Sequence, residues 1–397
     1  MNPGAHRNAL KIGILALAPL AIPQSMLNPV LPAIQAAFPN VAPSLIQLLS
    51  TIPSLCCVVF SPIYGKLTDL VTRRKILLTA IILLLTGGIL PAFVDNFTFF
   101  LMLRFVMGVG VGLLTPAAAD MIVYFFDGSA RQTMMGWNQA AASTGGVVFQ
   151  LLGGYLGGIN WRYACIATAV CAVFYLIAFI ILPEPERKAI TSEAGKRAKV
   201  KFRMPGRAWA LSIWYLFFAM SSFAFVTTTA MMAVGEKIAT PANLGFTMSL
   251  LTISVSVVAL FFGLNAKIFK GYVIAVGISV NAIAALVAFN GHSLILIDLA
   301  MVLCGVGLAM VVPGILTRVP SMVAPAAATM AMSIFYAASG LGQFVQPLVF
   351  AWIQKQLGIT DFRQAFIISM AGLIVLFVYM VIDAITYKDP KLRQAEA

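Results

Sequence analysis

The sequence predicts an all-α integral membrane protein with twelve transmembrane helices, arranged as two pseudo-symmetric six-helix bundles. Of its 397 residues, 61% are hydrophobic and only 10% are charged, and the mean hydropathy is +0.96. A soluble domain of this length could not hide so much apolar surface. Apolar runs recur along almost the whole chain, each close to the ~20 residues that cross a bilayer as a helix. We therefore expect neither a soluble protein nor an enzyme.

The N-terminal bundle is predicted over residues 1–182, and its first span over residues 11–36. This first span contains four prolines, which should bend it or unwind it locally. Charged residues or Gly, Pro and Asn clusters separate the later spans. These boundaries are Pro39–Pro43, Gly65–Lys75, Asp95–Asn96, Asp127–Arg131, Asn160–Arg162 and Pro183.

A change of composition separates the two bundles. Residues 183–207 contain eight Lys or Arg side chains against three glutamates, which predicts a basic, solvated linker. The C-terminal bundle is predicted over residues 208–397. Its turns lie near residues 236–237, 267–270, 290–292, 318–320 and 355–363. An internal repeat supports this division, because Ala-Ala-Ser occurs at 141–143 and again at 337–339, and Gln150 matches Gln346 at the same offset.

The turn at Gly65–Lys75 lies between two long apolar runs and carries three adjacent cations, Arg73, Arg74 and Lys75. Such a turn cannot lie in hydrocarbon, and its cations place it in the cytoplasm. The net charge of +13 gathers mainly on this same side, so we interpret it as the positive-inside bias, with anionic lipid headgroups rather than nucleic acid as its partner. An even number of spans puts both termini in the cytoplasm of a cell membrane.

The pattern Gly-x-Leu-x-Asp-x-x-x-Arg-Arg in this turn resembles the signature loop of the major facilitator superfamily. Gly65, Leu67, Asp69, Arg73 and Arg74 occupy its positions. The resemblance implies two six-helix bundles that move a small organic solute by alternating access. It also implies a monomer without a cofactor, with the proton gradient as its energy source.

Arg104 and the glycines that follow it resemble a second motif of the superfamily, whose arginine faces the central cavity. Alternatively, Arg104 reaches water or backbone carbonyls from the outer end of its span. Asp120 lies near the inner end of the same predicted helix. We interpret it as the partner of Arg73 and Arg74 in an inner gate that includes Gly65 and Asp69, and the alternative is a proton carrier. Asp69 is expected to meet the helix N-terminus at Pro325, and the second half shows no equivalent pair.

The fifth span resembles the antiporter motif of the superfamily, with glycines at its glycine positions. These are Gly136, Gly145, Gly153 and Gly154. The sequence departs from the motif at Phe149 and Gln150, which replace Gly-Pro. Close packing of small-residue helices is the alternative explanation of the glycines.

Polar and aromatic side chains inside the predicted spans are candidates for the substrate cavity. They are Gln24, Asn28, Asn138, Gln139, Gln150, Trp214, Tyr215, Tyr336, Gln343 and Gln346. Each could instead make helix–helix hydrogen bonds. We expect no catalytic or metal site, because His6 and His292 fall in predicted aqueous segments and the five cysteines lack metal-ligand spacing.

The favoured function is proton-linked efflux of amphipathic or drug-like compounds, as in the twelve-span drug–proton antiporter branch that the chain resembles. An organic-anion transporter or exchanger, of the carboxylate type and with Arg104 as counter-charge, is the main alternative, and a lipid flippase is a third. A non-transporting membrane sensor or scaffold is the alternative from another class. The presence of Asp69, Arg73 and Asp120 argues against a scaffold, which needs no gate.

Overall fold

The computed structural model describes residues 3–126, 128–182, 205–322, 328–358 and 361–386, and all regular secondary structure among them is helical. The predicted linker lies almost entirely outside these ranges, as do Pro325 and the tail after residue 386. Eleven stretches of the described chain are long and apolar enough to cross a membrane. Helix α7 is not among them, but its 32 residues give it a length of ~48 Å, which also suffices. The prediction of an all-α membrane fold is therefore confirmed.

The first span of the N-terminal half is irregular, as its prolines predicted. It runs through α1 (Pro3–Leu17), η1 (Ala18–Ala21), η2 (Pro23–Val30) and α2 (Leu31–Ala37). Proline lacks the N–H that an α-helix needs, and η1, η2 and α2 each carry proline in their first turn. The 3₁₀ turns at residues 18–30 therefore replace the middle of an α-helix.

The other five spans of this half are long helices with local breaks. They are α3 (Pro43–Leu70), α4 (Arg73–Ile89) with η3 (Leu90–Phe93), α5 (Phe97–Leu114) with α6 (Ala117–Phe125), α7 (Gly128–Ile159), and α8 (Trp161–Ile166) with η4 (Ala167–Ala169) and α9 (Val170–Ile181). One large apolar cluster, which includes Leu20, Leu84, Val111 and Phe149, fills the centre of this half.

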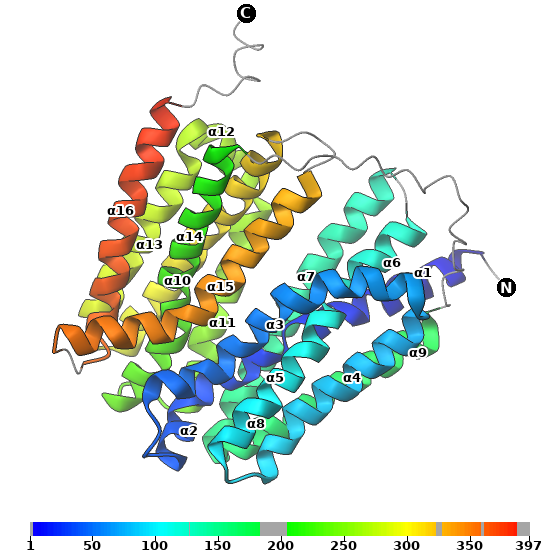
Figure 1. Ribbon diagram of the computed structural model, residues 1–397, viewed down its shortest axis with the longest axis horizontal. Helices are drawn as coiled ribbons and strands as arrows, with labels where there is room; N and C mark the ends of the chain where they lie inside the picture. The colour runs from blue at the N-terminus through cyan, green and yellow to red at the C-terminus, as the bar shows by residue number, and fades with distance from the viewer. Residues whose placement is uncertain (1–2, 127, 183–204, 323–327, 359–360, 387–397) are drawn as a thin grey trace, which may run out of the picture.

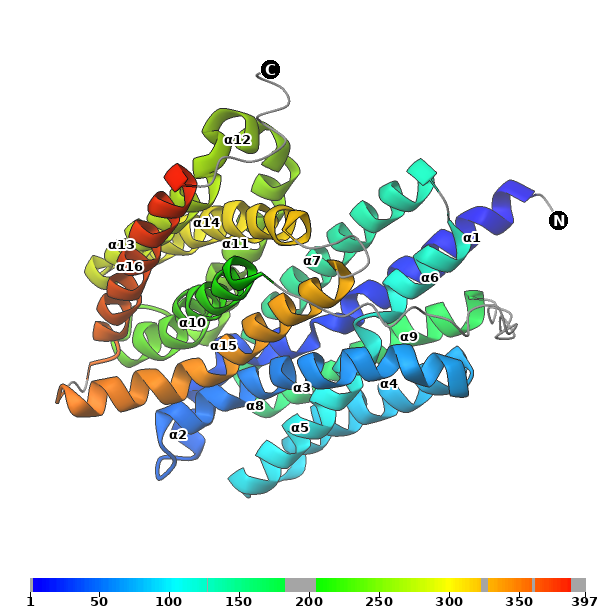
Figure 2. The same ribbon diagram turned by 45° about the horizontal axis from the view of Figure 1, so that its top comes forward.

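The C-terminal half repeats the arrangement with six further spans. They are α10 (Gly206–Gly235), α11 (Pro241–Leu260), α12 (Phe262–Phe269) with η6 (Lys270–Tyr272) and α13 (Val273–Asn290), α14 (Leu294–Ser321), α15 (Ala328–Gln356) and α16 (Gln364–Thr386). Two apolar clusters form its interior. Figures 1 and 2 show the two halves as separate bundles lying side by side.

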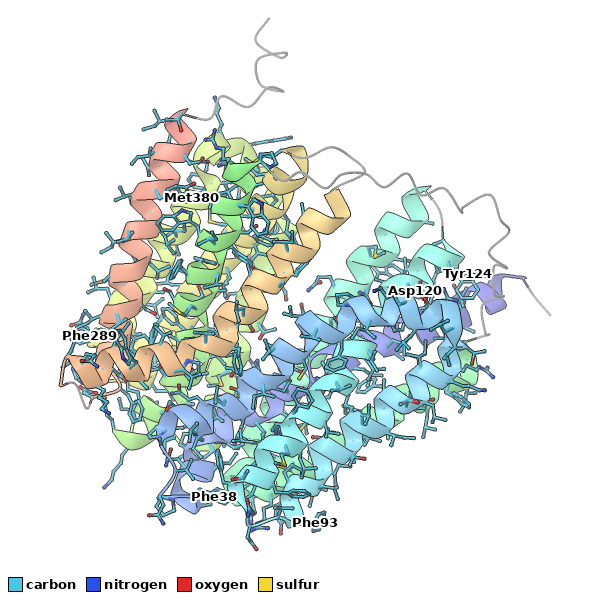
Figure 3. All side chains as sticks on the ribbon, viewed as in Figure 1. Phe38, Phe93, Asp120, Tyr124, Phe289 and Met380 are labelled. Carbon is cyan, nitrogen blue, oxygen red and sulfur yellow. The ribbon has the colours of Figure 1, made fainter. Side chains whose placement is uncertain are left out.

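The molecule has two distinct ends. Asp120, Tyr124 and Met380 lie at one end, which we call the linker end, and Phe38, Phe93 and Phe289 lie at the other, which we call the far end (Figure 3). The predicted turn at Gly65–Lys75 belongs to the linker end, but it is shorter than expected. Helix α3 continues to Leu70 and α4 begins at Arg73, so only Val71 and Thr72 lie between them.

The two halves meet along a seam formed mainly by α7 against α11 and by α3 against α15. At the far end this seam is closed, since Met231 and Phe362 of the C-terminal half pack into an apolar cluster of the N-terminal half. Towards the linker end the same helices are uncovered. Nothing lies within 4 Å of a Cβ built at Gly136 of α7, and Tyr336 of α15 is 54% exposed. The ribbons of α7 and α15 also diverge there in Figure 1. The halves are thus joined at the far end and apart at the linker end.

Candidate transport pathway between the two halves

Asp120 forms an ion pair with Arg73 at the linker end of the N-terminal half. The Nε and Nη2 atoms of Arg73 donate to the carboxylate at 2.7 and 3.4 Å, and the hydroxyl of Tyr64 donates to Oδ2 at 3.0 Å. The Arg73 guanidinium also lies over the ring of Tyr124, 5.8 Å from its centroid. The three bonded residues come from α3, α4 and α6. The pair therefore fastens three spans of one half together and does not itself bridge the seam.

The other positions of the predicted inner gate are only partly described. Arg74 donates from Nη2 to the carbonyl of Leu182 at 3.0 Å and lies over the ring of Phe179. Gly65 has open space where a Cβ would stand. The side chain of Asp69 and the proposed helix N-terminus at Pro325 lie outside the described residues, so their contact stays a prediction.

Arg104 is sealed inside the N-terminal half, with only 1% of its surface exposed. Its Nη1 lies 2.7 Å from the sulfur of Met107, its guanidinium lies 5.5 Å from the ring centroid of Phe100, and Cys165 of α8 is within hydrogen-bonding reach. Its Nε and Nη2 groups find no hydrogen-bond partner among the described residues. In this conformation Arg104 therefore lines no open surface of the seam and reaches no aqueous end of its span.

Three of the amide side chains predicted for the cavity also carry buried oxygen atoms without a partner in the described part of the chain. They are Gln24 and Asn28 of η2 and Asn138 of α7. The neighbouring Gln139 is exposed near the linker end of α7. Because an unpaired buried polar atom costs free energy, these amides are positions where water or a polar solute would bind favourably.

The glycines of α7 allow close packing against two different neighbours, the first span and helix α11. A Cβ at Gly145 would lie 2.6 Å from Pro19, and one at Gly153 would lie 1.9 Å from the carbonyl of Met26, so these glycines let α7 pack tightly on the first span. Gly154 instead faces the other half. Its Cβ would lie 2.7 Å from Cα of Gly245 in α11.

Polar contacts cross the seam next to these glycines. Thr252 of α11 donates to the Gln150 amide oxygen at 3.4 Å, and the hydroxyl of Ser249 lies 3.4 Å from the carbonyl of Val147. Gln150, which replaces a residue of the resembled antiporter motif, thus contacts the opposite half.

The candidates in the C-terminal half separate into packing residues and exposed residues. Tyr215 is buried and stacks on Phe335 with ring centroids 3.8 Å apart, and Trp214 stacks on Tyr379 at 4.5 Å. Both therefore belong to the interior contacts of this half. Tyr336, by contrast, is exposed.

The two candidate glutamines of α15 each find a hydrogen-bond partner within the same half. Gln343 donates to Ser339 at 3.3 Å, and the Gln346 amide oxygen accepts from Thr227 at 3.0 Å.

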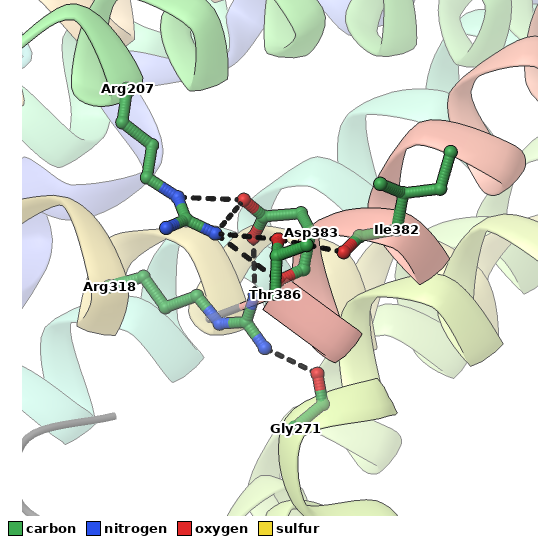
Figure 4. A network of polar contacts seen from close by, with 6 residues as sticks. All are labelled: Arg207, Gly271, Arg318, Ile382, Asp383 and Thr386. Atoms are coloured by element: carbon green, nitrogen blue, oxygen red, sulfur yellow. Dashed lines mark hydrogen bonds and ion pairs between the residues drawn. The ribbon is translucent and has the colours of Figure 1, made fainter. Parts of the chain in front are cut away.

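The C-terminal half has its own ionic cluster at the linker end, which sequence reasoning missed and which lies outside the stretch 263–270 that resembles the signature loop. Asp383 of α16 accepts from Nε of Arg207 at 2.8 Å and from Nη1 of Arg318 at 3.3 Å, and Arg318 also donates to the carbonyl of Gly271 (Figure 4). The cluster ties together α10, α14, α16 and η6. Its members are up to 176 residues apart in the chain, and no local motif marks them.

The far end carries two further ion pairs that sequence reasoning missed. Arg363 is 6% exposed and donates to Glu236 at 2.6 Å and to the carbonyls of Phe289 and Gly291. In the N-terminal half Arg162 pairs with Asp95. The sequence did place these charges in the turns of the far end, but it could not show which of them meet.

Comparison with known proteins shows which protein family the sequence matches. The family model of the Major Facilitator Superfamily matches residues 14–240. The chain is 27% identical over 137 residues to the multidrug transporter protein MdtP of Bacillus subtilis, covering 34% of this chain and 25% of that protein. It is 22% identical over 156 residues to the putative niacin/nicotinamide transporter NiaP of the same organism, covering 39% of each. The matches thus span about a quarter to two fifths of these relatives.

The fold also matches a solved structure along its whole length. A bacterial homologue of the human lysosomal transporter Spinster, in an inward-facing and unoccupied conformation, superimposes with a TM-score of 0.80 at 17% identity. The match covers 98% of this chain and 100% of that one. At this level of identity the likeness concerns the fold alone.

Proposed function

Because the chain belongs to the major facilitator superfamily, and is therefore a multi-pass membrane transporter rather than an enzyme, we propose that it exports amphipathic or drug-like compounds in exchange for protons. In this proposal the two halves rock about the seam and expose it to one side of the membrane at a time. The proton gradient drives the exchange in this proposal.

The observation that carries the proposal is a set of uncharged residues on the described seam faces of α7 and α15 at the linker end, where the halves are apart. Residues three or four apart share one face of a helix. The face of α7 that meets α11 at Gly154 continues towards the linker end through Ser143 and Gly136, and the face of α15 that meets α3 at Gly340 continues through Tyr336. Small, hydroxyl and aromatic side chains of this kind suit an amphipathic solute better than a strongly charged one.

The orientation of the protein is also part of the proposal. The described cations of the linker end, among them Lys66, Lys75, Lys267 and Lys270, outnumber those of the far end. The described residues that flank the basic stretch 183–204 also belong to this end, since the Leu182 carbonyl binds Arg74 and Arg207 binds Asp383. Under the positive-inside rule, the linker end and both termini lie in the cytoplasm of a cell membrane. The conformation seen here is then inward-facing.

Everted membrane vesicles test this function directly. We expect ethidium to accumulate in vesicles that contain the protein when the interior is acidified, and to leak out when an uncoupler removes the proton gradient. Tyr336→Ala should reduce the rate, whereas Leu78→Ala, at an exposed position of α4, should not. Transport that persists with the uncoupler, or that is absent for ethidium and for other amphipathic dyes, would contradict the proposal.

A second candidate, transport of an organic anion, is favoured by the Nε and Nη2 groups of Arg104, which find no partner among the described residues. Its burial by Phe100, Met107 and Cys165 means that an anion could reach it only after these side chains move. Arg104→Gln separates the two candidates. If amphipathic cations are the solutes, their binding should survive this change. Loss of carboxylate binding in Arg104→Gln, with partial recovery in Arg104→Lys, would support the anion instead, because lysine keeps the charge but not the fork of donors.

A further inference from the structure

A cavity of about 260 Å³ lies in the seam at the far end, opposite to the side where the halves are apart. It is enclosed by α3 of the N-terminal half and by α10, α15 and the start of α16 of the C-terminal half. Its mouth is at the exposed residues Ala42 and Lys355, so it opens to the aqueous phase on the far side.

Three deeply buried polar side chains, one from each of three helices, line this cavity. Gln47 of α3 is 6% exposed, Thr228 of α10 is 2% exposed and Gln346 of α15 is 1% exposed. The amide oxygen of Gln346 accepts from Thr227, which leaves its NH₂ group available. Among the described residues, no hydrogen bond is formed by the Gln47 amide or by the Thr228 hydroxyl. The cavity thus exposes hydrogen-bonding groups that its own walls do not satisfy.

The charge at the cavity decides which ligand suits it. Lys355 is the one charged residue among the described side chains that line it, and it stands at the mouth. Two amide NH₂ groups, a hydroxyl and an ammonium group together supply donors for an oxyanion. We propose that this cavity binds the carboxylate or sulfonate group of a small solute that arrives from the far side, at a site separate from the pathway that opens at the linker end.

Occupancy of this site should also favour one conformation. A ligand held by Gln47 touches the N-terminal half, and one held by Thr228 and Gln346 touches the C-terminal half. When the far end opens, α3 and α15 separate and the ligand loses one set of partners. This step rests on the proposed rocking of the halves. By linkage, a far-side oxyanion would therefore stabilise the conformation that is open at the linker end and slow the transport cycle.

The anion preference can be measured by thiol labelling. We place one cysteine at Ser44, which lines the cavity, in a background without the five native cysteines. This cysteine should react faster with the anionic sulfonatoethyl methanethiosulfonate than with the cationic trimethylammonioethyl reagent of similar size. The ratio of the two rates at Ser44 should exceed the same ratio for a cysteine at Asn290, on the same end, by roughly five- to tenfold. Lys355→Gln, an exposed change, should abolish this ratio, and succinate should slow labelling at Ser44 whereas succinamide should not.

Two outcomes would overturn the inference. Equal rates of labelling by the two reagents, unaffected by Lys355→Gln and by succinate, would show that the cavity does not bind oxyanions. Lys66 and Lys267 lie at the linker end of opposite halves. If succinate protects Ser44 but does not lengthen the distance between spin labels at these two positions, then binding at the cavity does not shift the conformational equilibrium. Neither readout requires transport of a drug, so a failure here is distinct from a failure of the proposed function.

Discussion

Replacing Gly154 by alanine is expected to force the far end of the seam open. Gly154 of α7 faces α11 of the other half, and a Cβ at this position would lie 2.7 Å from Cα of Gly245, 2.8 Å from the carbonyl oxygen of Pro241 and 2.9 Å from N of Gly245. All three are backbone atoms, which cannot rotate away. Two helices from different halves must therefore separate before a methyl group fits.

The size of the effect follows from these distances. Ordinary contact of a Cβ begins near 3.4 Å, so α7 and α11 must move apart by about 0.7 Å at this point. Overpacking of this kind typically costs about 1–3 kcal/mol. The cost applies only while the far end is closed, so it shifts the equilibrium towards the conformation open at the far end by roughly 5- to 150-fold.

Spin labels at Lys66 of α3 and Lys267 of α12 would report this shift as shorter distances at the linker end, measured by double electron–electron resonance. Gly136→Ala is the matched control, because it lies on the same helix with nothing within 4 Å. Gly158→Ala is a second control at the far end, where the nearest atom is 3.7 Å away. The reasoning is refuted if Gly154→Ala gives the same distance distribution as Gly136→Ala.

Three further predictions concern stability and orientation. Asp120→Asn should lower the free energy of unfolding by about 1.5–3 kcal/mol, because it removes the charged acceptor of Arg73, and denaturant titration of purified protein would measure this. Arg363→Gln should cost more, about 3–5 kcal/mol, because it breaks the bonds of a buried guanidinium to Glu236 and to the carbonyls of Phe289 and Gly291; a melting temperature equal to wild type would contradict it. Single cysteines at Ser192 and Asn290 should react with an impermeant thiol reagent on intact cells only at Asn290.

The spans and their breaks could be predicted because they depend on local composition. Hydrocarbon requires long apolar helices, and the charged turns between them must lie in water. The prolines of the first span predicted its irregular backbone from the same local argument, since each removes a hydrogen-bond donor wherever it stands in the fold. The predicted turn at residues 267–270 falls where the short helix α12 ends and η6 begins, and Lys270 at this junction has a positive φ of 47°.

The contacts between distant residues could not be predicted in the same way. Asp383 meets Arg207 and Arg318 only because three helices converge at the linker end, and sequence spacing carries no sign of this convergence. Arg104 illustrates a second limit. Its position in a span predicted a costly charge, but the direction of its side chain depends on the rotation of α5, which places it against Phe100 and Met107. Hydrophobic periodicity is a poor guide to that rotation in a helix that is apolar on all sides.

The distribution of ion pairs explains how such a molecule can move. The five ion pairs that join described residues all lie within one half or the other, at the linker end or at the far end. The closed part of the seam relies instead on glycine contacts, apolar packing at Met231 and Phe362, and weak hydrogen bonds such as that of Gln150. Separating the halves therefore breaks no described ion pair. In the proposed rocking motion, the ion pairs keep each bundle rigid while the seam exchanges only apolar contacts and weak hydrogen bonds.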